Sequence, residues 1–158
     1  MREFLASLEE LALSRWIHEA NTIWAFPTIL FVHTFGMAIV AGGSAMLDLI
    51  VLGFWPAAPL KPFARLFPVL WIAFALNAAT GTMLLLADAT AKLTMLDFYI
   101  KMALVFAGFY TLVRMRKLFD DPKFNPAALP QGAKALAWAS LACWLGAITA
   151  GRLLAYVQ

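Results

Sequence analysis

The sequence predicts an all-α integral membrane protein, a four-helix bundle with an amphipathic interfacial helix at its N-terminus. Hydrophobic residues make up 63% of the chain and charged residues 13%, against about 45–50% and about 25% in soluble domains. The apolar residues gather into four blocks, each long enough to cross a hydrocarbon layer about 30 Å thick at about 1.5 Å per helical residue. These blocks nearly exhaust the 158 residues, so we expect a single transmembrane domain, 1–158.

The first predicted element is an amphipathic helix over residues 3–18. Its glutamates, Glu3, Glu9 and Glu10, fall on the side opposite to the apolar residues at a period of 3.6. The apolar side consists of Phe4, Leu5, Leu8, Leu11, Ala12 and Trp16. We expect this helix to lie in the membrane interface, either packed on the mouth of the bundle or docked on a partner.

Four membrane spans follow, at about 23–52, 63–87, 96–118 and 133–156. The proline-rich segment WPAAPLKP ends the first span, and the polar segment ADATAKLTMLD separates the second from the third. The third span ends in a basic run that begins at Arg114, and the proline-containing stretch DDPKFNPAALPQG forms the last loop.

The distribution of lysine and arginine predicts the orientation. Seven of the 12 lie on the side of the first and third loops: Lys61, Arg65, Arg114, Arg116, Lys117, Lys123 and Lys134. Because loops rich in these residues stay in the cytoplasm, both termini should face the periplasm of a bacterial inner membrane. The basic residues flank apolar spans instead of forming a stripe with aromatic residues, so the partner they indicate is the lipid bilayer and not nucleic acid.

Five polar residues lie at membrane depth near the periplasmic side. Measured from the helix ends, His33 is about 10–14 Å deep, Thr80 about 10 Å, Asn77 about 15 Å, Lys101 about 6 Å and Arg152 about 6–8 Å. A charged side chain at the centre of a span costs about 2.5–3.5 kcal/mol, so such residues turn inward, pair, or serve a function. Each sits on a face that its helix can turn inward, which predicts one polar pocket open to the periplasm.

The chemistry of this pocket suits a ligand with an acidic edge and an apolar body. Haem b or another porphyrin fits, with His33 as the axial metal ligand and Lys101 and Arg152 on the propionates. A quinone also fits, with His33 or Asn77 donating to a carbonyl oxygen. If neither is present, we expect no cofactor.

Simpler roles stand beside each of these interpretations. His33 can serve as a hydrogen-bond partner between helices, Lys101 can extend outward with Asp97 one turn before it, and Arg152 can anchor the helix at the interface. Asp48, near the cytoplasmic end of the first span, is expected to pair with Lys61 and Arg65 there.

Small residues recur at helical spacing in the first and fourth spans. They are Ala38 with Gly42, Ala41 with Ala45, and the series Ala139, Ala142, Gly146 and Ala150. Such pairs let helices approach closely, so we expect them to form packing seams. The alternative is that the glycines near His33 make room for a planar ligand.

Two stretches carry a resemblance to known membrane proteins: HTFGMAIVAGGSAMLDLIVLG (33–53) and ATGTMLLLADATAKLTMLDFYIKMALVFAG (79–108). They resemble an uncharacterised family of small four-helix bacterial inner-membrane proteins and cover about a third of the chain. More distantly, the layout is similar to the four-helix membrane protoporphyrinogen oxidases and the copper-resistance D-type membrane proteins. In the oxidases a first-helix histidine and a later lysine are associated with haem or porphyrin, and His33 and Lys101 match them. The further histidines of that family are absent, so the resemblance implies porphyrin binding more than porphyrin oxidation.

These observations predict an inner-membrane redox or cofactor-binding protein that holds a haem-like, porphyrin-like or quinone ligand in the periplasmic half of the bundle. The alternative is a non-catalytic accessory subunit that packs through its small-residue seams against a larger membrane complex or a second copy. A transporter is disfavoured, because four spans without repeat symmetry or a continuous polar stripe make a poor pathway.

Overall fold

The computed structural model describes residues 9–10, 12–19, 22, 24–55, 60–121, 129–130 and 132–154, and these ranges contain helices and no strand. Four helices are long and apolar enough to cross a membrane: α3 (Phe26–Leu52), α5 (Leu66–Ala87, with an apolar stretch from Pro62), α7 (Leu96–Asp120) and α8 (Ala133–Leu153). Three short helices accompany them: α2 (Ala12–Glu19), α4 (Leu60–Ala64) and α6 (Ala89–Lys92). The all-helical class and the four long apolar helices are confirmed. Residues 3–8 and 11 of the expected first helix, residue 23 of the first span and residues 155–156 of the fourth span lie outside the described residues.

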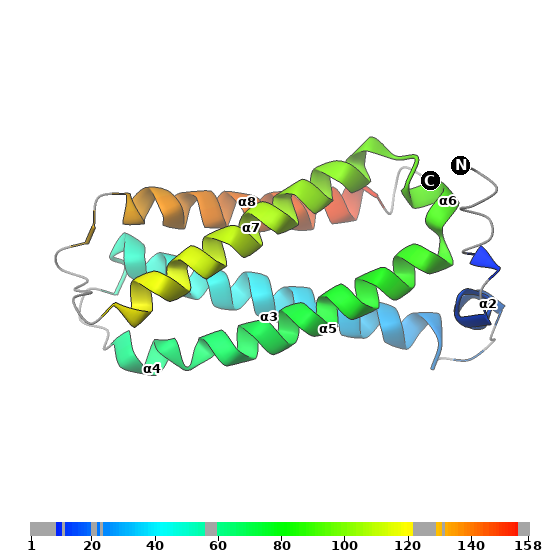
Figure 1. The fold of residues 1–158 in the computed structure, drawn as a ribbon, viewed down its shortest axis with the longest axis horizontal. Helices are drawn as coiled ribbons and strands as arrows, with labels where there is room; N and C mark the ends of the chain where they lie inside the picture. The colour runs from blue at the N-terminus through cyan, green and yellow to red at the C-terminus, as the bar shows by residue number, and fades with distance from the viewer. Residues whose placement is uncertain are drawn as a thin grey trace.

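The four long helices lie side by side and alternate in direction (Figure 1). Helix α3 packs against both α5 and α8, and α7 packs against α8. Helices α2 and α6 lie at one end of this arrangement, called the α6 end below, and α4 lies at the other, the α4 end. Aromatic contacts of Phe109 on α7 with Trp71 and Phe74 on α5 join the two remaining neighbours, with ring centroids 5.4 and 4.6 Å apart.

Glycine and proline set two of the helix boundaries. Gly53 follows α3 with φ 92°, a conformation that residues with a Cβ rarely adopt, and its N–H bonds the Ile50 carbonyl. Pro68 has no N–H to offer the carbonyl of Ala64, which separates α4 from α5 at Arg65. That carbonyl accepts a hydrogen bond from Arg116 Nη1 of α7 at 3.4 Å instead.

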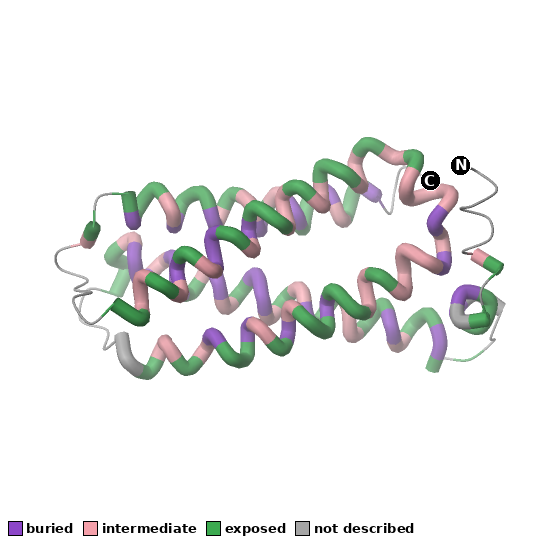
Figure 2. Tube along the Cα trace, in the orientation of Figure 1, coloured by how far each residue is buried: buried purple, intermediate pink, exposed green. Residues whose placement is uncertain are grey.

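Most of the interior near the α4 end and through the middle is apolar, apart from buried polar residues on α3, α7 and α8. One cluster of buried side chains joins all four long helices, and its largest members are Leu47, Phe67, Leu70, Leu112 and Met115. A second cluster, toward the α6 end, contains Val40, Ala41, Ala73 and Trp144. Figure 2 shows buried and exposed positions alternating along each long helix, and the exposed ones include many large apolar side chains, such as Phe31, Ile72, Phe106 and Leu145.

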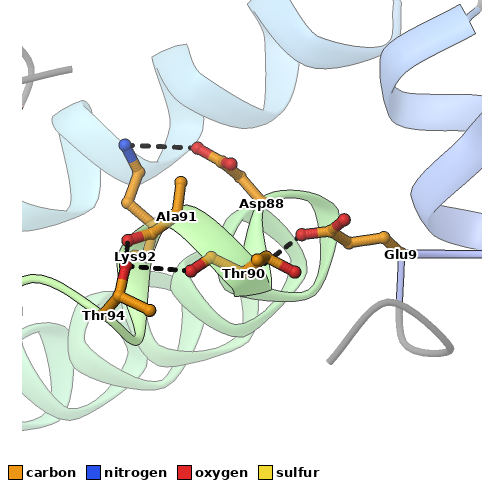
Figure 3. A network of polar contacts seen from close by, with 6 residues as sticks. All are labelled: Glu9, Asp88, Thr90, Ala91, Lys92 and Thr94. Carbon is orange, nitrogen blue, oxygen red and sulfur yellow. Dashed lines mark hydrogen bonds and ion pairs between the residues drawn. The ribbon is translucent and has the colours of Figure 1, made fainter. Parts of the chain in front are cut away.

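Helix α2 is docked on the α6 end. Ile17 is buried against Ile29 of α3 and Ala87 of α5, and the Ser14 hydroxyl donates to the Leu86 carbonyl at 3.1 Å. Glu9, just before α2, accepts the backbone N–H of Thr90 on α6 at 2.7 Å (Figure 3).

The expected apolar face of this first helix is wrong where the structure describes it. Trp16 is 45% exposed and Ala12 is exposed, whereas Ser14 and Ile17 face the protein. The packed face of so short a helix depends on the surface that receives it, and here that surface supplies a carbonyl for Ser14 as well as an apolar hollow.

The packing seams are confirmed in part. Ala41 and Ala150 are buried and Ala45 and Gly146 are half-buried, whereas Ala38, Gly42, Ala139 and Ala142 are exposed. A Cβ on Gly146 would stand 3.0 Å from Leu104 Cδ1 of α7, so this seam glycine is a close approach of α7 and α8. Two further close approaches involve glycines that the spacing rule does not select: a Cβ on Gly36 would stand 3.3 Å from the Ala73 carbonyl oxygen, and one on Gly108 would stand 3.0–3.2 Å from three ring atoms of Trp144.

This difference yields a matched pair of predictions. Gly108→Ala should lower the free energy of unfolding by about 1–3 kcal/mol, because the added methyl overlaps a buried, rigid indole. Gly42→Ala should raise it by up to about 1 kcal/mol, since a Cβ there meets nothing within 4 Å and alanine favours the helix. Denaturation of the two purified variants, followed by helical circular dichroism, tests the pair. Equal effects would contradict the α7–α8 packing.

Candidate functional site

His33 lies on α3, where the first polar residues of α5 face it. Its Nδ1 atom lies 3.1 Å from the backbone carbonyl oxygen of Asn77 and 3.1 Å from Thr80 Oγ1. The Asn77 side chain returns a bond, its Nδ2 donating to the His33 carbonyl at 2.6 Å. The imidazole itself is half-buried. The predicted proximity of His33, Asn77 and Thr80 is confirmed.

These contacts decide which imidazole nitrogen carries the proton. A carbonyl oxygen only accepts, so Nδ1 must donate to Asn77. The Thr80 hydroxyl donates to the Leu76 carbonyl at 2.7 Å and is therefore an acceptor toward the imidazole. With Nδ1 protonated, the neutral ring has its lone pair on Nε2, and Nε2 makes no hydrogen bond to any residue in the described ranges.

Helix α5 also provides the space for this ring. A Cβ at Gly81 would stand 3.0 Å from His33 Cε1 and 3.4 Å from Nδ1. One stretch, NAATG (77–81), thus supplies a carbonyl, a hydroxyl and a gap to the same imidazole. The ring is held in one orientation from the α5 side.

Lys101 approaches from α7 and rests against α8. Its side chain is half-buried, and a Cβ at Gly151 would stand 3.5 Å from Cε and 3.7 Å from Nζ. The ammonium lies within electrostatic range of both His33 and Lys92. The expected outward pairing with Asp97 is not formed. The ion pair at this end, within the part of the chain that the structure describes, joins Lys92 to Asp88 at 3.3 Å instead (Figure 3).

Lys101 makes no hydrogen bond or ion pair with any described residue, so a half-buried cation beside His33 lacks an anion. Gly151, which makes room for it, was not among the residues that the sequence singled out. In the sequence, Gly151 could have been noticed as a small residue directly before Arg152, on the last turn of α8.

Arg152 does not join these groups. It is exposed, although its face of α8 was expected to turn inward. Its neighbours on that face are exposed too: Trp138, Leu145 and Thr149. The inward face instead carries Ser140, Trp144, Ala147 and Ala150. One residue corresponds to about 100° around a helix, and α8 has apolar or small residues on all sides, so periodicity does not select the correct face.

Below His33 and Lys101 the interior is apolar and aromatic. Met37, one turn along α3 from His33, packs with Phe74 on the cluster around Trp144. Gly146 lies against Leu104 of α7, where a Cβ would stand 3.0 Å from Cδ1. A polar imidazole and a cation therefore stand over an apolar layer, the arrangement that an amphiphilic ring system requires.

A second polar cluster, which sequence reasoning placed elsewhere, lies between α3 and α8. Asp48 is 1% exposed, and the hydroxyl of the equally buried Ser140 donates to its carboxyl group. Its Oδ2 atom, Ser44 Oγ and Trp144 Nε1 are buried without hydrogen-bond partners. Ser44 lies one turn before Asp48 on α3, and Trp144 lies one turn after Ser140 on α8. Because α3 and α8 are antiparallel, both lie toward the α6 end from the Asp48–Ser140 pair. In the sequence, the four-residue spacing on each span, between Ser44 and Asp48 and between Ser140 and Trp144, was the feature that could have placed these polar groups on one face.

The expected pairing of Asp48 with basic residues is wrong for Arg65, which is exposed, and the Lys61 side chain lies outside the described residues. The ion pairs within the described ranges join Lys92 to Asp88 and Arg116 to Asp120, and neither includes Asp48. Asp48 faces α8 instead of the loop.

Comparison of the chain with models of known families, with curated proteins and with solved structures gives no match. Within the described residues, no three histidine, cysteine, aspartate or glutamate side chains gather into a metal site. A metal at this site would therefore take one imidazole ligand, His33, from this part of the chain.

Proposed function

We propose that the four long helices cross a bacterial inner membrane as a bundle, with the α6 end on the periplasmic side. The outward apolar side chains support insertion, because large exposed residues such as Phe31 and Leu145 match hydrocarbon better than water. The basic residues Arg65, Arg114 and Lys117 gather toward the α4 end, which supports a cytoplasmic location for that end.

Within this bundle, we propose a redox or cofactor-binding site for a haem-like, porphyrin-like or quinone ligand between His33 and Lys101. The observation that carries the proposal is the orientation of His33. Its Nδ1–H is held by a backbone carbonyl and a hydroxyl, as in most metal-binding histidines, and its Nε2 lone pair has no described partner. The unpaired Lys101 ammonium supplies the charge that a propionate requires.

For haem or a metalloporphyrin, Nε2 of His33 would bind the metal and Lys101 would hold an acidic edge. Bound haem supplies one-electron chemistry, while the protein sets the orientation of the imidazole and the polarity around the ring. The layer formed by Met37, Phe74 and Trp144 excludes water from the apolar part of the ligand.

For a quinone, the same tautomer gives Nε2 a different role from the one expected. The Asn77 amide already uses one of its two N–H donors on the His33 carbonyl, and its side chain is buried, so it is poorly placed to donate to a quinone. With a quinol bound, Nε2 would instead accept the hydroxyl proton, the electron pair of the broken O–H bond would stay on the oxygen, and Lys101 would stabilise that charge.

An accessory subunit of a larger complex is the alternative, and one observation favours it. Ala38 and Gly42 are exposed on the outer face of α3, so this pair is open to a helix of another chain. Under that proposal His33 serves to join α3 to α5 and binds no ligand.

Titration of the purified protein with haem and with a short-chain quinol separates these proposals. We expect a saturable Soret band with haem, or saturable quenching of the six tryptophans with quinol. The expected control is His18→Ala, which removes the other histidine and should leave the titration unchanged. Protein that stays colourless, shows no quenching and purifies with another membrane protein would favour the accessory subunit.

A further inference from the structure

A groove of about 580 Å³ lies between α7 and α8 at the α4 end, far from His33. Its walls come from the last three turns of α7 and the first two turns of α8, with Pro130 and Gly132 at the edge. It is distinct from the apolar hollow between α3 and α5, which is lined by apolar residues alone and offers nothing to select an occupant.

The polarity of this groove differs between its two walls. Arg114, Lys117 and Asp121 line it on α7, while Leu136 and Ala139 line it on α8. From Gly132 to Ala139 the helix rises about 10 Å. In the proposed membrane orientation, the groove therefore runs from the level of the lipid headgroups into the acyl-chain region.

The charges at its outer part are available to a ligand. Arg114 and Lys117 are exposed, and neither belongs to an ion pair within the described ranges. The intervening Arg116 is already engaged within the protein chain, because it pairs with Asp120 at the surface and lies over the Phe67 ring. Two cations and one carboxylate, that of Asp121, thus line the groove, and the excess positive charge favours an anionic ligand.

Tyr110 lies one turn before Arg114 on the α7 wall. Its hydroxyl accepts a hydrogen bond from Arg114 Nη1 at 3.4 Å, which leaves the phenol proton free to donate into the groove. Tyrosine at this depth has an apolar ring beside acyl chains and a polar tip at the headgroups.

We propose that this groove binds an anionic phospholipid, with Arg114 and Lys117 on the phosphate and one acyl chain along Leu136 and Ala139. Basic pockets between helices on the cytoplasmic side are suited to such headgroups. The inference rests on the proposed membrane insertion and is independent of the ligand at His33.

Native mass spectrometry of the protein in detergent, with phosphatidylglycerol or phosphatidylcholine of the same acyl chains, tests the site. We expect preferential retention of phosphatidylglycerol. The double variant Arg114→Gln/Lys117→Gln should weaken this retention about 25-fold, at about fivefold for each cation. The matched controls are Lys134→Gln and Arg65→Gln, exposed cations of the same end that do not line the groove, and they should change it less than twofold.

A second variant tests the acyl-chain part with both cations in place. Ala139→Trp fills the apolar floor and should reduce retention at least as strongly as the double variant, with helical circular dichroism unchanged. Equal losses in the control variants would show general surface attraction and overturn the site. Unchanged retention in Ala139→Trp would overturn the placement of the lipid.

Glycerol phosphate distinguishes a lipid from its free headgroup. We expect no displacement of bound phosphatidylglycerol by an equal concentration of glycerol phosphate, and displacement would identify a phosphate site instead. Protein that washes from membranes without detergent would refute insertion itself. A missing Soret band would refute only the proposal at His33.

Discussion

His33→Ala should abolish saturable haem binding, and Thr80→Val should weaken it by about 10–100-fold. The first variant removes the ligand atom, Nε2. The second removes the hydroxyl that accepts from Nδ1–H, with little change in volume, and loss of such an outer partner typically costs this much metal affinity. Titration of each variant with haem, followed at the Soret band, gives the dissociation constants. For a quinol ligand, tryptophan quenching should show the same order of affinities, with His33→Ala binding more weakly than Thr80→Val.

Thr82→Val is the matched control for this series. Thr82 lies half a turn from Thr80 on α5 and also donates to the carbonyl four residues earlier, but it is exposed and makes no contact with His33. It should bind haem as the unmodified protein does. If Thr80→Val and Thr82→Val weaken binding equally, or if His33→Ala keeps its Soret band, then His33 is not the ligand.

Ser140→Ala should lower the free energy of unfolding by about 1–3 kcal/mol. The Ser140 hydroxyl is the donor to Asp48, and its removal leaves the whole buried carboxyl group without a hydrogen bond. Denaturation in detergent micelles, followed by helical circular dichroism, measures the change. Thr149→Ala on the exposed face of the same helix should stay within about 0.5 kcal/mol, since Thr149 bonds only its own helix.

The double variant Asp48→Leu/Ser140→Ala tests the reason for this loss. Replacing the carboxyl group by an apolar side chain removes the unsatisfied acceptor, so the double variant should be more stable than Ser140→Ala alone. Additive destabilisation would mean that Asp48 and Ser140 act independently, contrary to the observed contact.

The long helices were predictable because the features that define them are local in the sequence. The length of an apolar block sets whether it can span a membrane, and prolines and charged runs mark its ends. The observed helices begin and end close to the expected residues at Leu52, Ala87, Leu96 and Ala133. Gly53 and Pro68 act through their own backbone chemistry, which the neighbouring helices do not alter.

Part of the site was predictable for the same local reason. Asn77, Thr80 and Gly81 lie within about one turn of one helix, so any rotation that turns one toward α3 turns the others nearby. His33 needed only to meet that face. Lys101 could be placed in the same half of the bundle, but its contact with Gly151 depends on how closely α7 and α8 approach.

What the sequence determined by itself was the helical class, the four apolar helices and the polar group around His33. Tertiary structure decided the rotation of each helix about its axis, and so moved Arg152 outward, Asp48 toward Ser140 and Ile17 instead of Trp16 into the interior. The physical reason is that these helices are apolar on nearly every side. Burial in hydrocarbon and burial in protein then favour the same side chains, and only close packing against particular neighbours distinguishes one face from another.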